Sequence, residues 1–269
     1  MPVVKITSFS NPHIKHVVKL RENKARQETG LTIVEGAREI KAAQESGVVF
    51  KEIYICDDFK EVVPLNEFVN IFTKKQILIL ETSKEIFAKI SYGDRMEGIL
   101  AVCEIPQHDW MSLKLTQKPL YVIVENVEKP GNLGAMMRTC DAAGVDGLIV
   151  CDPKTDIYNP NVIRASLGTV FSIPIFVSTN SAVWEFLSNQ KINICASSPE
   201  AKIIYTQVNL NIPLAIVVGS EDKGLSDFWL KKAKLQVKIP MKGRANSLNV
   251  SATAATLIYE VVRQRGLKG

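Results

Sequence analysis

The sequence predicts an α/β protein of two domains, with a mostly parallel sheet in the larger, C-terminal one. After residue 118, near-continuous apolar runs are separated by helical segments, which is typical of a parallel sheet covered on both faces. Before residue 105, shorter strand and helix patterns alternate. The stretch 106–117, PQHDWMSLKLTQ, starts with proline and lacks a clear period. We therefore expect a small α/β domain at 1–105, a linker at 106–117 and a second domain at 118–269.

The N-terminal domain is expected to begin with one or two basic helices over Ile14–Arg26. Its other elements alternate in type along the chain. The expected strands are Leu31–Glu35, Lys51–Cys56, Ile77–Leu80 and Gly98–Cys103. The expected helices are Ala37–Glu45, Glu61–Asn70 and Ser83–Ser91.

The C-terminal domain is expected to hold six buried strands and to end in a helix over Asn249–Arg265. The strands are Leu120–Val124, Gly147–Cys151, Ile173–Val177, Ile192–Ala196, Leu214–Val218 and Leu235–Ile239. Ligands of parallel sheets bind beyond the carboxyl ends of the strands. We therefore expect a functional site in the loops that follow these strands.

Composition favours a globular cytoplasmic protein. Apolar residues make up 46% of the chain and charged residues 23%, which is enough to build real cores. No secretory leader opens the sequence and no apolar run approaches 18 residues, so we expect a soluble protein that spans no membrane. The cysteines are scattered without a CxxC pair, so we expect reduced thiols and no zinc site.

The net charge of +5 comes from the C-terminal domain. Residues 118–269 contain 17 basic and 12 acidic side chains, whereas residues 1–117 contain 16 of each. Within the neutral half, the first 30 residues hold six Lys or Arg against two Glu. A solvated charged face and a surface for a polyanion both explain this distribution.

Three segments follow strands and combine glycines with polar side chains. They are Asn126–Gly144 (NVEKPGNLGAMMRTCDAAG), Ile216–Ser226 (IVVGSEDKGLS) and Ile239–Glu260 (IPMKGRANSLNVSATAATLIYE). Each polar residue alone has an ordinary interpretation, since Ser247 and Asn249 precede a helix and are typical caps. In this order and spacing, however, the segments resemble the three sequence motifs of the SpoU family of RNA ribose 2′-O-methyltransferases, in the SPOUT superfamily. The residues that carry the resemblance are Asn132, Arg138, Gly219, Glu221, Gly224-Leu225-Ser226 and Ser247-Leu248-Asn249.

The resemblance covers the chain from about Lys118 to its C-terminus and implies several properties. It implies a SPOUT domain with a deep trefoil knot, S-adenosylmethionine as cofactor, RNA as substrate and a homodimer. The implied catalytic residues are Asn132, Arg138, Glu221, Ser247 and Asn249. The implied cofactor-binding residues are Gly219, Ser220, Gly224, Ile239, Met241, Leu248 and Asn249.

The chemistry of methyl transfer suits the residues that are present. No histidine follows residue 117, which excludes a Ser-His-Asp hydrolase or a histidine-ligated metal centre in the C-terminal domain. A sulfonium methyl donor needs no metal. In the family the arginine is proposed to activate the 2′-OH, but a guanidinium holds its proton too strongly to be a ready base. We expect Arg138 instead to orient the hydroxyl through a phosphate and to stabilise the developing alkoxide.

The N-terminal segment IVEGAREIKAAQESG, with Glu35-Gly36 and Arg38, resembles the ribosomal-protein-like substrate-binding domain that precedes many SpoU catalytic domains. The segment NVIRASLG at Asn161–Gly168 also resembles a family segment. Arg38 and Arg164 are thus candidate RNA-binding residues, although a structural ion pair is an equal alternative for Arg164. A folded domain of this kind favours ribosomal RNA over transfer RNA. The methylated nucleotide and any role in antibiotic resistance stay open.

Two alternatives come from other classes of protein. A dinucleotide-binding oxidoreductase would explain the strand, Gly-x-x-Gly and helix of Val122–Gly134, but the segment lacks G-x-G-x-x-G and carries the insert Glu125–Asn132. A catalytically silent RNA-binding factor is the other alternative. The presence of Asn132, Arg138, Glu221 and Asn249 argues against it.

Overall fold

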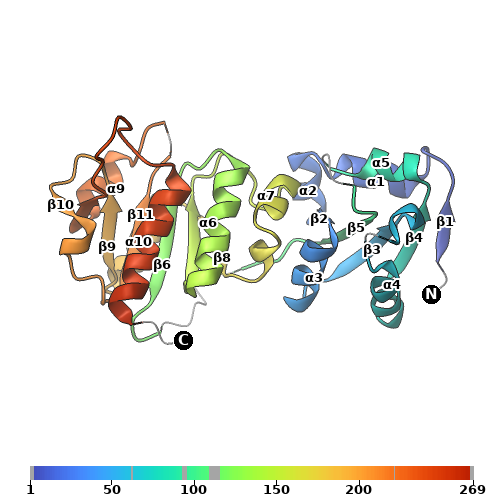
Figure 1. The fold of residues 1–269 in the computed structure, drawn as a ribbon, viewed down its shortest axis with the longest axis horizontal. Coiled ribbons are helices and arrows are strands. Elements are labelled where there is room, and N and C mark those ends of the chain that lie inside the picture. The colour runs from blue at the N-terminus through green and yellow to red at the C-terminus, as the bar shows by residue number, and fades with distance from the viewer. Residues whose placement is uncertain (1–2, 62, 93–95, 109–115, 221, 267–269) are drawn as a thin grey trace. The chain divides into compact units, whose positions relative to one another are not determined.

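The computed structural model describes residues 3–61, 63–92, 96–108, 116–220 and 222–266 (Figure 1). The chain forms two compact units. Unit 1 comprises Met1–Gln107 together with Asp156–Ser172, and unit 2 comprises His108–Thr155 and Ile173–Gly269. None of the helices in the described ranges is both long enough and apolar enough to cross a membrane.

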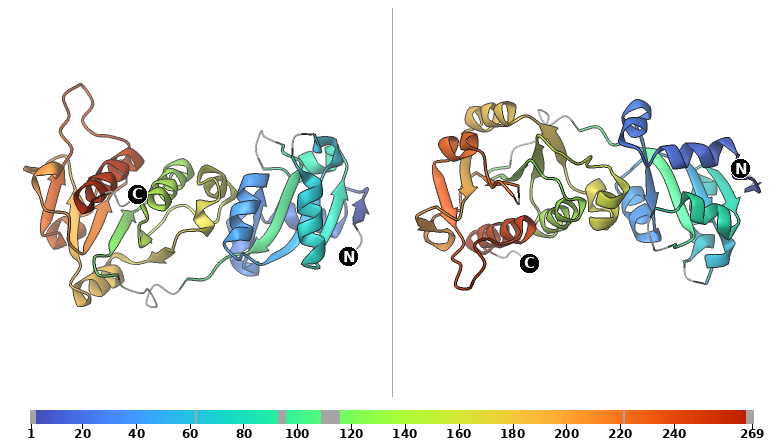
Figure 2. Two further views of the ribbon diagram at one scale, coloured as in Figure 1. Left: turned by 60° about the horizontal axis from the view of Figure 1, so that its bottom comes forward. Right: turned by 90° about the horizontal axis from the view of Figure 1, so that it is seen from above.

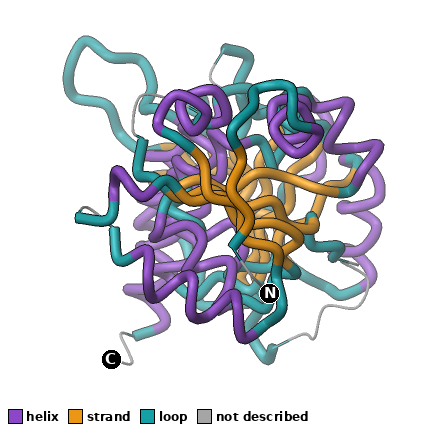
Figure 3. The backbone as a smooth tube through the Cα atoms, turned by 90° about the vertical axis from the view of Figure 1, so that its right-hand side faces the viewer, coloured by secondary structure: helices purple, strands orange, loops and turns teal. Residues whose placement is uncertain are grey.

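Unit 1 contains a mixed sheet in the order β1-β4-β3-β5-β2. Figure 3 colours the strands orange and the helices purple. The pairs β1–β4 and β3–β4 are parallel, and β3–β5 and β2–β5 are antiparallel. Its strands are β1 (Val4–Ile6), β2 (Leu31–Glu35), β3 (Phe50–Ile55), β4 (Leu78–Thr82) and β5 (Ile99–Glu104). Its helices are α1 (Pro12–Lys19), α2 (Asn23–Thr29), α3 (Ala37–Glu45), α4 (Leu65–Lys74), α5 (Lys84–Ile90) and α7 (Pro160–Ala165), with short 3-10 turns at η1 (Asp57–Phe59) and η3 (Thr169–Phe171).

The apolar spacing of the helices explains their packing in unit 1. Helices α1 and α5 share one core cluster with β-strand residues, to which α1 contributes Ile14 and Val17. Helix α4 buries Leu65, Phe68 and Phe72, which lie on one helical face. This helix starts later than the predicted Glu61–Asn70, because Pro64 disfavours helical geometry in the residue before it and becomes the N-cap.

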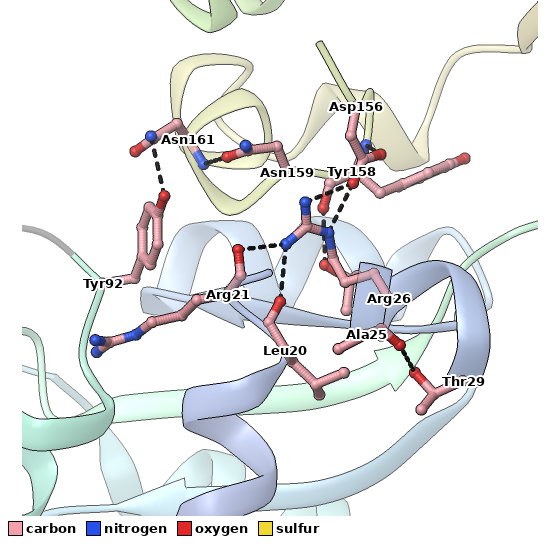
Figure 4. A network of polar contacts seen from close by, with 11 residues as sticks. Leu20, Arg21, Ala25, Arg26, Thr29, Tyr92, Asp156, Tyr158, Asn159 and Asn161 are labelled. Atoms are coloured by element: carbon pink, nitrogen blue, oxygen red, sulfur yellow. Dashed lines mark hydrogen bonds and ion pairs between the residues drawn. The ribbon is translucent and has the colours of Figure 1, made fainter. Parts of the chain in front are cut away.

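The segment 156–172 packs in unit 1, although the sequence places it in the C-terminal domain. The Arg26 guanidinium binds the Asp156 carboxylate at 2.7 Å and donates to the carbonyls of Leu20 and Arg21, as Figure 4 shows. The buried Thr32 hydroxyl donates to the Tyr158 carbonyl. A Cβ atom at Gly168 would lie 2.6 Å from the Cβ of Ala42, so this close approach requires glycine. The chain therefore leaves the C-terminal sheet after β7, completes unit 1, and returns. The remaining domain boundaries stay a prediction.

Unit 2 contains a parallel sheet in the order β10-β12-β9-β11-β6-β7-β8. Its strands are β6 (Leu120–Glu125), β7 (Gly147–Cys151), β8 (Ile175–Ser178), β9 (Asn193–Ser197), β10 (Ile203–Ile204), β11 (Leu214–Val218) and β12 (Leu235–Lys238). Its helices are α6 (Pro130–Ala143), α8 (Asn180–Asn189), α9 (Asp227–Lys232) and α10 (Val250–Arg265), with a 3-10 turn at η4 (Tyr205–Gln207). The six predicted strands are present, and the edge strand β10 is additional.

Helices cover both faces of this sheet, as Figure 2 shows. Helices α6 and α10 pack together on one face, and α8 and α9 lie on the other over a core that includes Val183, Leu187 and Trp229. From β6 the chain proceeds outward to β7 and β8, and then returns to the other side of β6 through β9 and β11. The strand order therefore reverses beside β6, which is where open α/β sheets bind ligands. The trefoil knot that the resemblance implies stays a prediction.

Candidate active site

A cavity of about 370 Å³ opens at the carboxyl ends of β9, β11 and β12. Its volume falls within the range of small-molecule sites, about 300–1,000 Å³. The second and third sequence motifs supply much of its wall, and six of the seven residues predicted to bind a cofactor line it. These are Gly219, Ser220, Gly224, Ile239, Met241 and Leu248. Ser247 also lines the cavity, as do Ser198 and Lys223, which sequence reasoning did not single out.

The loop after β11 is folded tightly against this cavity. A Cβ atom at Gly219 would lie 2.0 Å from the backbone carbon of Gly224, so no side chain fits there. Gly224 adopts a φ of 65°, and its N–H donates to the Ser220 carbonyl at 3.0 Å. The two glycines thus bring the backbone itself to the cavity wall. Glu221, predicted to be catalytic, lies outside the described residues.

Two asparagines from the first and third motifs meet beside the cavity. The Asn249 side-chain amide donates to the Asn132 carbonyl oxygen at 3.1 Å. The Asn249 oxygen also accepts from the backbone N–H of Ser251 at 2.9 Å, so Asn249 is the N-cap of α10 as well. Asn132 borders a smaller hollow that shares Gly219 and Ser220 with the main cavity. The Asn249 side chain therefore caps α10 and bonds to Asn132 at the same time.

Arg138 is exposed on α6 and does not line the cavity of its own chain. It follows Asn132 by six residues, which places it about 9 Å further along the helix axis and on a different face. Among the residues that the structure describes, no carboxylate forms an ion pair with it. Its guanidinium is thus available to an external anion.

Sequence reasoning did not single out Glu125, a buried carboxylate whose hydrogen bonds join the segments at the carboxyl ends of the strands. Glu125, at the end of β6, is 1% exposed. It accepts hydrogen bonds from the Ser226 backbone N–H at 2.8 Å, the Ser226 hydroxyl at 2.7 Å and the Asn180 amide at 2.6 Å. The Asn180 oxygen in turn accepts from the Trp229 indole at 2.7 Å. Glu125 thereby fastens the end of the second motif to β6. An acid directly after a buried strand, at the ligand-binding edge, is the signal that identifies it.

Other charges near this edge form pairs or remain open to solvent. Lys154 pairs with Glu128, and this hydrogen bond lowers the pKa of the Glu128 carboxyl. Lys242 and Arg244 are exposed on the loop that leads to Ser247. The structure describes no group of three or more His, Cys, Asp or Glu side chains arranged to hold a metal ion, within the ranges that it covers.

The two predicted RNA-binding arginines differ in their surroundings within unit 1. Arg38 is exposed on α3. Arg164 is partly buried, donates to the Tyr92 carbonyl at 3.1 Å and faces the Glu35 carboxylate. Burial raises the pKa of Glu35, and the hydrogen bonds from Ser91 and Tyr92 and the Arg164 charge oppose that rise. Arg38 is therefore the freer of the two to contact RNA.

The fold is that of an α/β protein with a cavity at the carboxyl ends of β9, β11 and β12 of a parallel sheet. The SpoU rRNA methylase family model matches residues 119–259, and a model of the MRM3-like substrate-binding domain matches residues 11–101. The chain belongs to the SpoU rRNA methylase family. This family consists of methyltransferases, so the match does not support the alternative that the chain is an oxidoreductase.

Relatives resemble this chain over almost its whole length. It is 27% identical to the 23S rRNA (guanosine(2553)-2′-O)-methyltransferase RlmP of Bacillus subtilis over 257 residues, which cover 96% of this chain and 98% of RlmP. A crystal structure of an RNA 2′-O ribose methyltransferase superposes with a TM-score of 0.86 at 36% identity, covering 97% of this chain and 99% of the other. An AdoMet-bound rRNA methyltransferase from Sinorhizobium meliloti has a TM-score of 0.86 at 27% identity, covering 97% and 98%.

Proposed function

We propose that this chain transfers a methyl group from S-adenosylmethionine to a ribose 2′-OH of 23S-type ribosomal RNA. The observation that carries the proposal is the meeting of Asn132 and Asn249 beside the cavity, although 117 residues separate them in the sequence. The full-length similarity to an rRNA 2′-O-methyltransferase supports ribosomal RNA as the substrate class. The proposed location is the cytoplasm, where ribosomes are assembled and used.

The residues around the cavity fit the proposed cofactor. Backbone at Gly219 and Gly224 is close enough to contact an adenosine directly, because neither position carries a side chain. Ile239, Met241 and Leu248 offer apolar contacts to a base. S-adenosylmethionine supplies an activated sulfonium, whose methyl transfer needs no metal. The chain itself must therefore bind, orient and exclude water.

The polar groups beside the cavity have separate proposed roles. Asn132 and Asn249 hold the target ribose, Ser247 completes the cofactor wall, and Glu221 orients Asn132 or Arg138 by charge-assisted hydrogen bonds. Arg138 positions the hydroxyl through a neighbouring phosphate and stabilises its developing negative charge. Because Arg138 lies outside the cavity of its own chain, it reaches a ribose either by side-chain movement or from a second copy.

The proposed function is tested by two measurements on the full chain. S-adenosylmethionine is expected to bind in calorimetric titrations with excess chelator present, and a loss of binding under chelation would contradict the metal-free site. RNA from cells with and without this protein is then mapped for 2′-O-methyl groups. If cells without this protein lack a methyl group in 23S rRNA, the proposal is supported. If the missing methyl group is in tRNA, tRNA is the substrate instead.

We also propose a homodimer. The sequence offers Leu257, Ile258, Val261 and Val262 as apolar support, but Leu257, Ile258 and Val261 are fully buried within their own unit. Tyr259, by contrast, is 47% exposed on the same helix. Burial of such an aromatic side chain is typical of the centre of an interface.

Light scattering of the parent is expected to give about twice the chain mass of 29.8 kDa at micromolar concentration. Tyr259→Glu is expected to give monomers, because it places a charge in the apolar centre of the contact. Val177→Glu, at a residue that is 50% exposed on the edge strand β8, is the control and is expected to stay dimeric. A monomeric parent would refute the dimer.

Glu125→Ala is expected to raise the dissociation constant for S-adenosylmethionine by roughly 10-fold. It removes the acceptor for Ser226 and Asn180, and unsatisfied buried donors cost about 1–3 kcal/mol. The part of the cavity wall formed by Gly224 and Leu225, next to Ser226, then becomes less ordered. Titration calorimetry measures the effect, with circular dichroism to verify the fold. Glu185→Ala, at an exposed residue on α8, is the matched control. Equal affinities for S-adenosylmethionine in the two variants would show that Glu125 does not support the cofactor site.

A further inference from the structure

A second hollow, of about 220 Å³, lies at the opposite edge of the sheet in unit 2. It is formed at the amino ends of β9 and β12, between α8 and the turn that follows α9. The residues on which its chemistry depends are Trp184, Ser188, Lys191, Asn193, Lys232 and Lys234. The proposed S-adenosylmethionine cavity lies at the carboxyl ends of the same strands, so the two sites are distinct.

The lining of this hollow is basic. Its lining includes Lys191, Lys232 and Lys234 and no Asp or Glu. Within the described ranges, none of the three lysines forms an ion pair. The nearby Asp227 is paired with Lys231 at 3.5 Å, and Glu185 is exposed next to Trp184 in the sequence. Because these positive charges lack paired carboxylates, an anion placed among them would be attracted.

Trp184 fixes the position of one of these charges. The Lys232 ammonium lies 3.7 Å from the centroid of the Trp184 ring, within the range of a cation–π interaction. The ring itself is partly buried and packs against the core of unit 2. Lys232 is therefore held in place before any ligand arrives, which reduces the entropy lost on binding. The Ser188 hydroxyl adds a neutral donor to the same wall, whereas the Asn193 amide already donates to the Pro213 carbonyl at 3.2 Å.

We propose that this hollow binds a backbone phosphate of the RNA substrate, away from the nucleotide that is methylated. This inference rests on the proposed function, since RNA is then the polyanion that the protein must hold. The volume is smaller than that of most small-molecule pockets, and suits one phosphate with part of its ribose. Contacts of lysines to phosphates position a nucleic acid without reading its sequence. The hollow therefore contributes to RNA affinity and not to the choice of nucleotide.

The test compares two double variants of the full chain. Lys191→Ala/Lys234→Ala removes two charges of the hollow and leaves the Lys232–Trp184 contact intact. Lys118→Ala/Lys202→Ala removes two exposed lysines of unit 2 that do not line the hollow, and is the matched control. RNA affinity is measured from about 50 to 200 mM salt, the range in which phosphate contacts change affinity steeply, on an RNA that the parent methylates.

The hollow variant is expected to bind RNA about 10-fold more weakly at low salt, with a log–log salt slope smaller by about one, the change expected when one phosphate contact is lost. Its affinity for S-adenosylmethionine and its single-turnover rate at saturating RNA are expected to equal those of the parent. The control is expected to keep the parental slope. If the two double variants show the same slope while the parent methylates RNA, this inference is wrong and the proposed function stands. If the parent neither binds nor methylates RNA, the proposed function itself fails.

Discussion

Arg26→Ala is expected to lower the unfolding free energy of unit 1 by about 3–5 kcal/mol, which is the usual cost of removing one partner of a buried ion pair. The guanidinium is 1% exposed and the Asp156 side chain is 17% exposed, so neither charge is well solvated once it is alone. Removing the guanidinium also leaves the carbonyls of Leu20 and Arg21 without this donor. Asp156 opens the segment that returns from the C-terminal sheet, and the loss therefore loosens residues 156–172 from β2.

Lys24→Ala is the matched control for Arg26, because Lys24 is on the same helix with a side chain that is 84% exposed. Its i,i+4 pair with Glu28 contributes little, so a change within about 0.5 kcal/mol is expected. Because the chain has two units, a single melting curve is not a two-state measurement. Hydrogen exchange of the β2 and α7 amides reports on unit 1 alone. Protection that falls no further in Arg26→Ala than in Lys24→Ala would show that the pair is dispensable.

Much of the fold was predictable because local pattern and burial agree in unit 2. The central strands β6, β7 and β11 are apolar runs that are buried along their whole length, as expected for a parallel sheet that is covered on both faces. The placement of residues 156–172 was not predictable in this way. It depends on Arg26 and Thr32 meeting partners about 130 residues later in the chain, and no local pattern encodes such a pairing.

The candidate site shows the same division between local and long-range information. Many residues that line the cavity were predicted, because they belong to the motifs on which the resemblance rests. The glycines at Gly219 and Gly224 are explained by the close approach of the backbone and by its conformation there. Glu125 was missed because a single acid at the end of a strand is common, and only its bonds to Ser226 and Asn180 reveal its importance. Asn249 looked like an ordinary cap in the sequence. It is one, and its second hydrogen bond to Asn132 becomes visible only in the fold.

Arg138→Ala is expected to reduce single-turnover methyl transfer by roughly 10²-fold or more, which corresponds to about 2.7 kcal/mol of transition-state stabilisation. Its affinity for S-adenosylmethionine is expected to stay within a few-fold of the parent, because Arg138 does not line the cavity. Arg138→Lys should restore little activity, since a point charge cannot replace the planar fork of the guanidinium on a phosphate. The assay uses an RNA that the parent methylates, alongside calorimetric titration of the cofactor.

Asn249→Ala provides the contrast that separates catalysis from binding. Asn249 caps α10 and donates to Asn132 beside the cavity, so its loss is expected to weaken cofactor binding and turnover together. Arg138→Ala should instead change turnover alone, because an interaction made only in the transition state lowers the rate without changing ground-state affinity. If Arg138→Ala turns over at the parental rate, the arginine is an exposed surface charge and another group must stabilise the alkoxide. A variant that loses cofactor affinity as well would place Arg138 in the cofactor site, contrary to its position on α6.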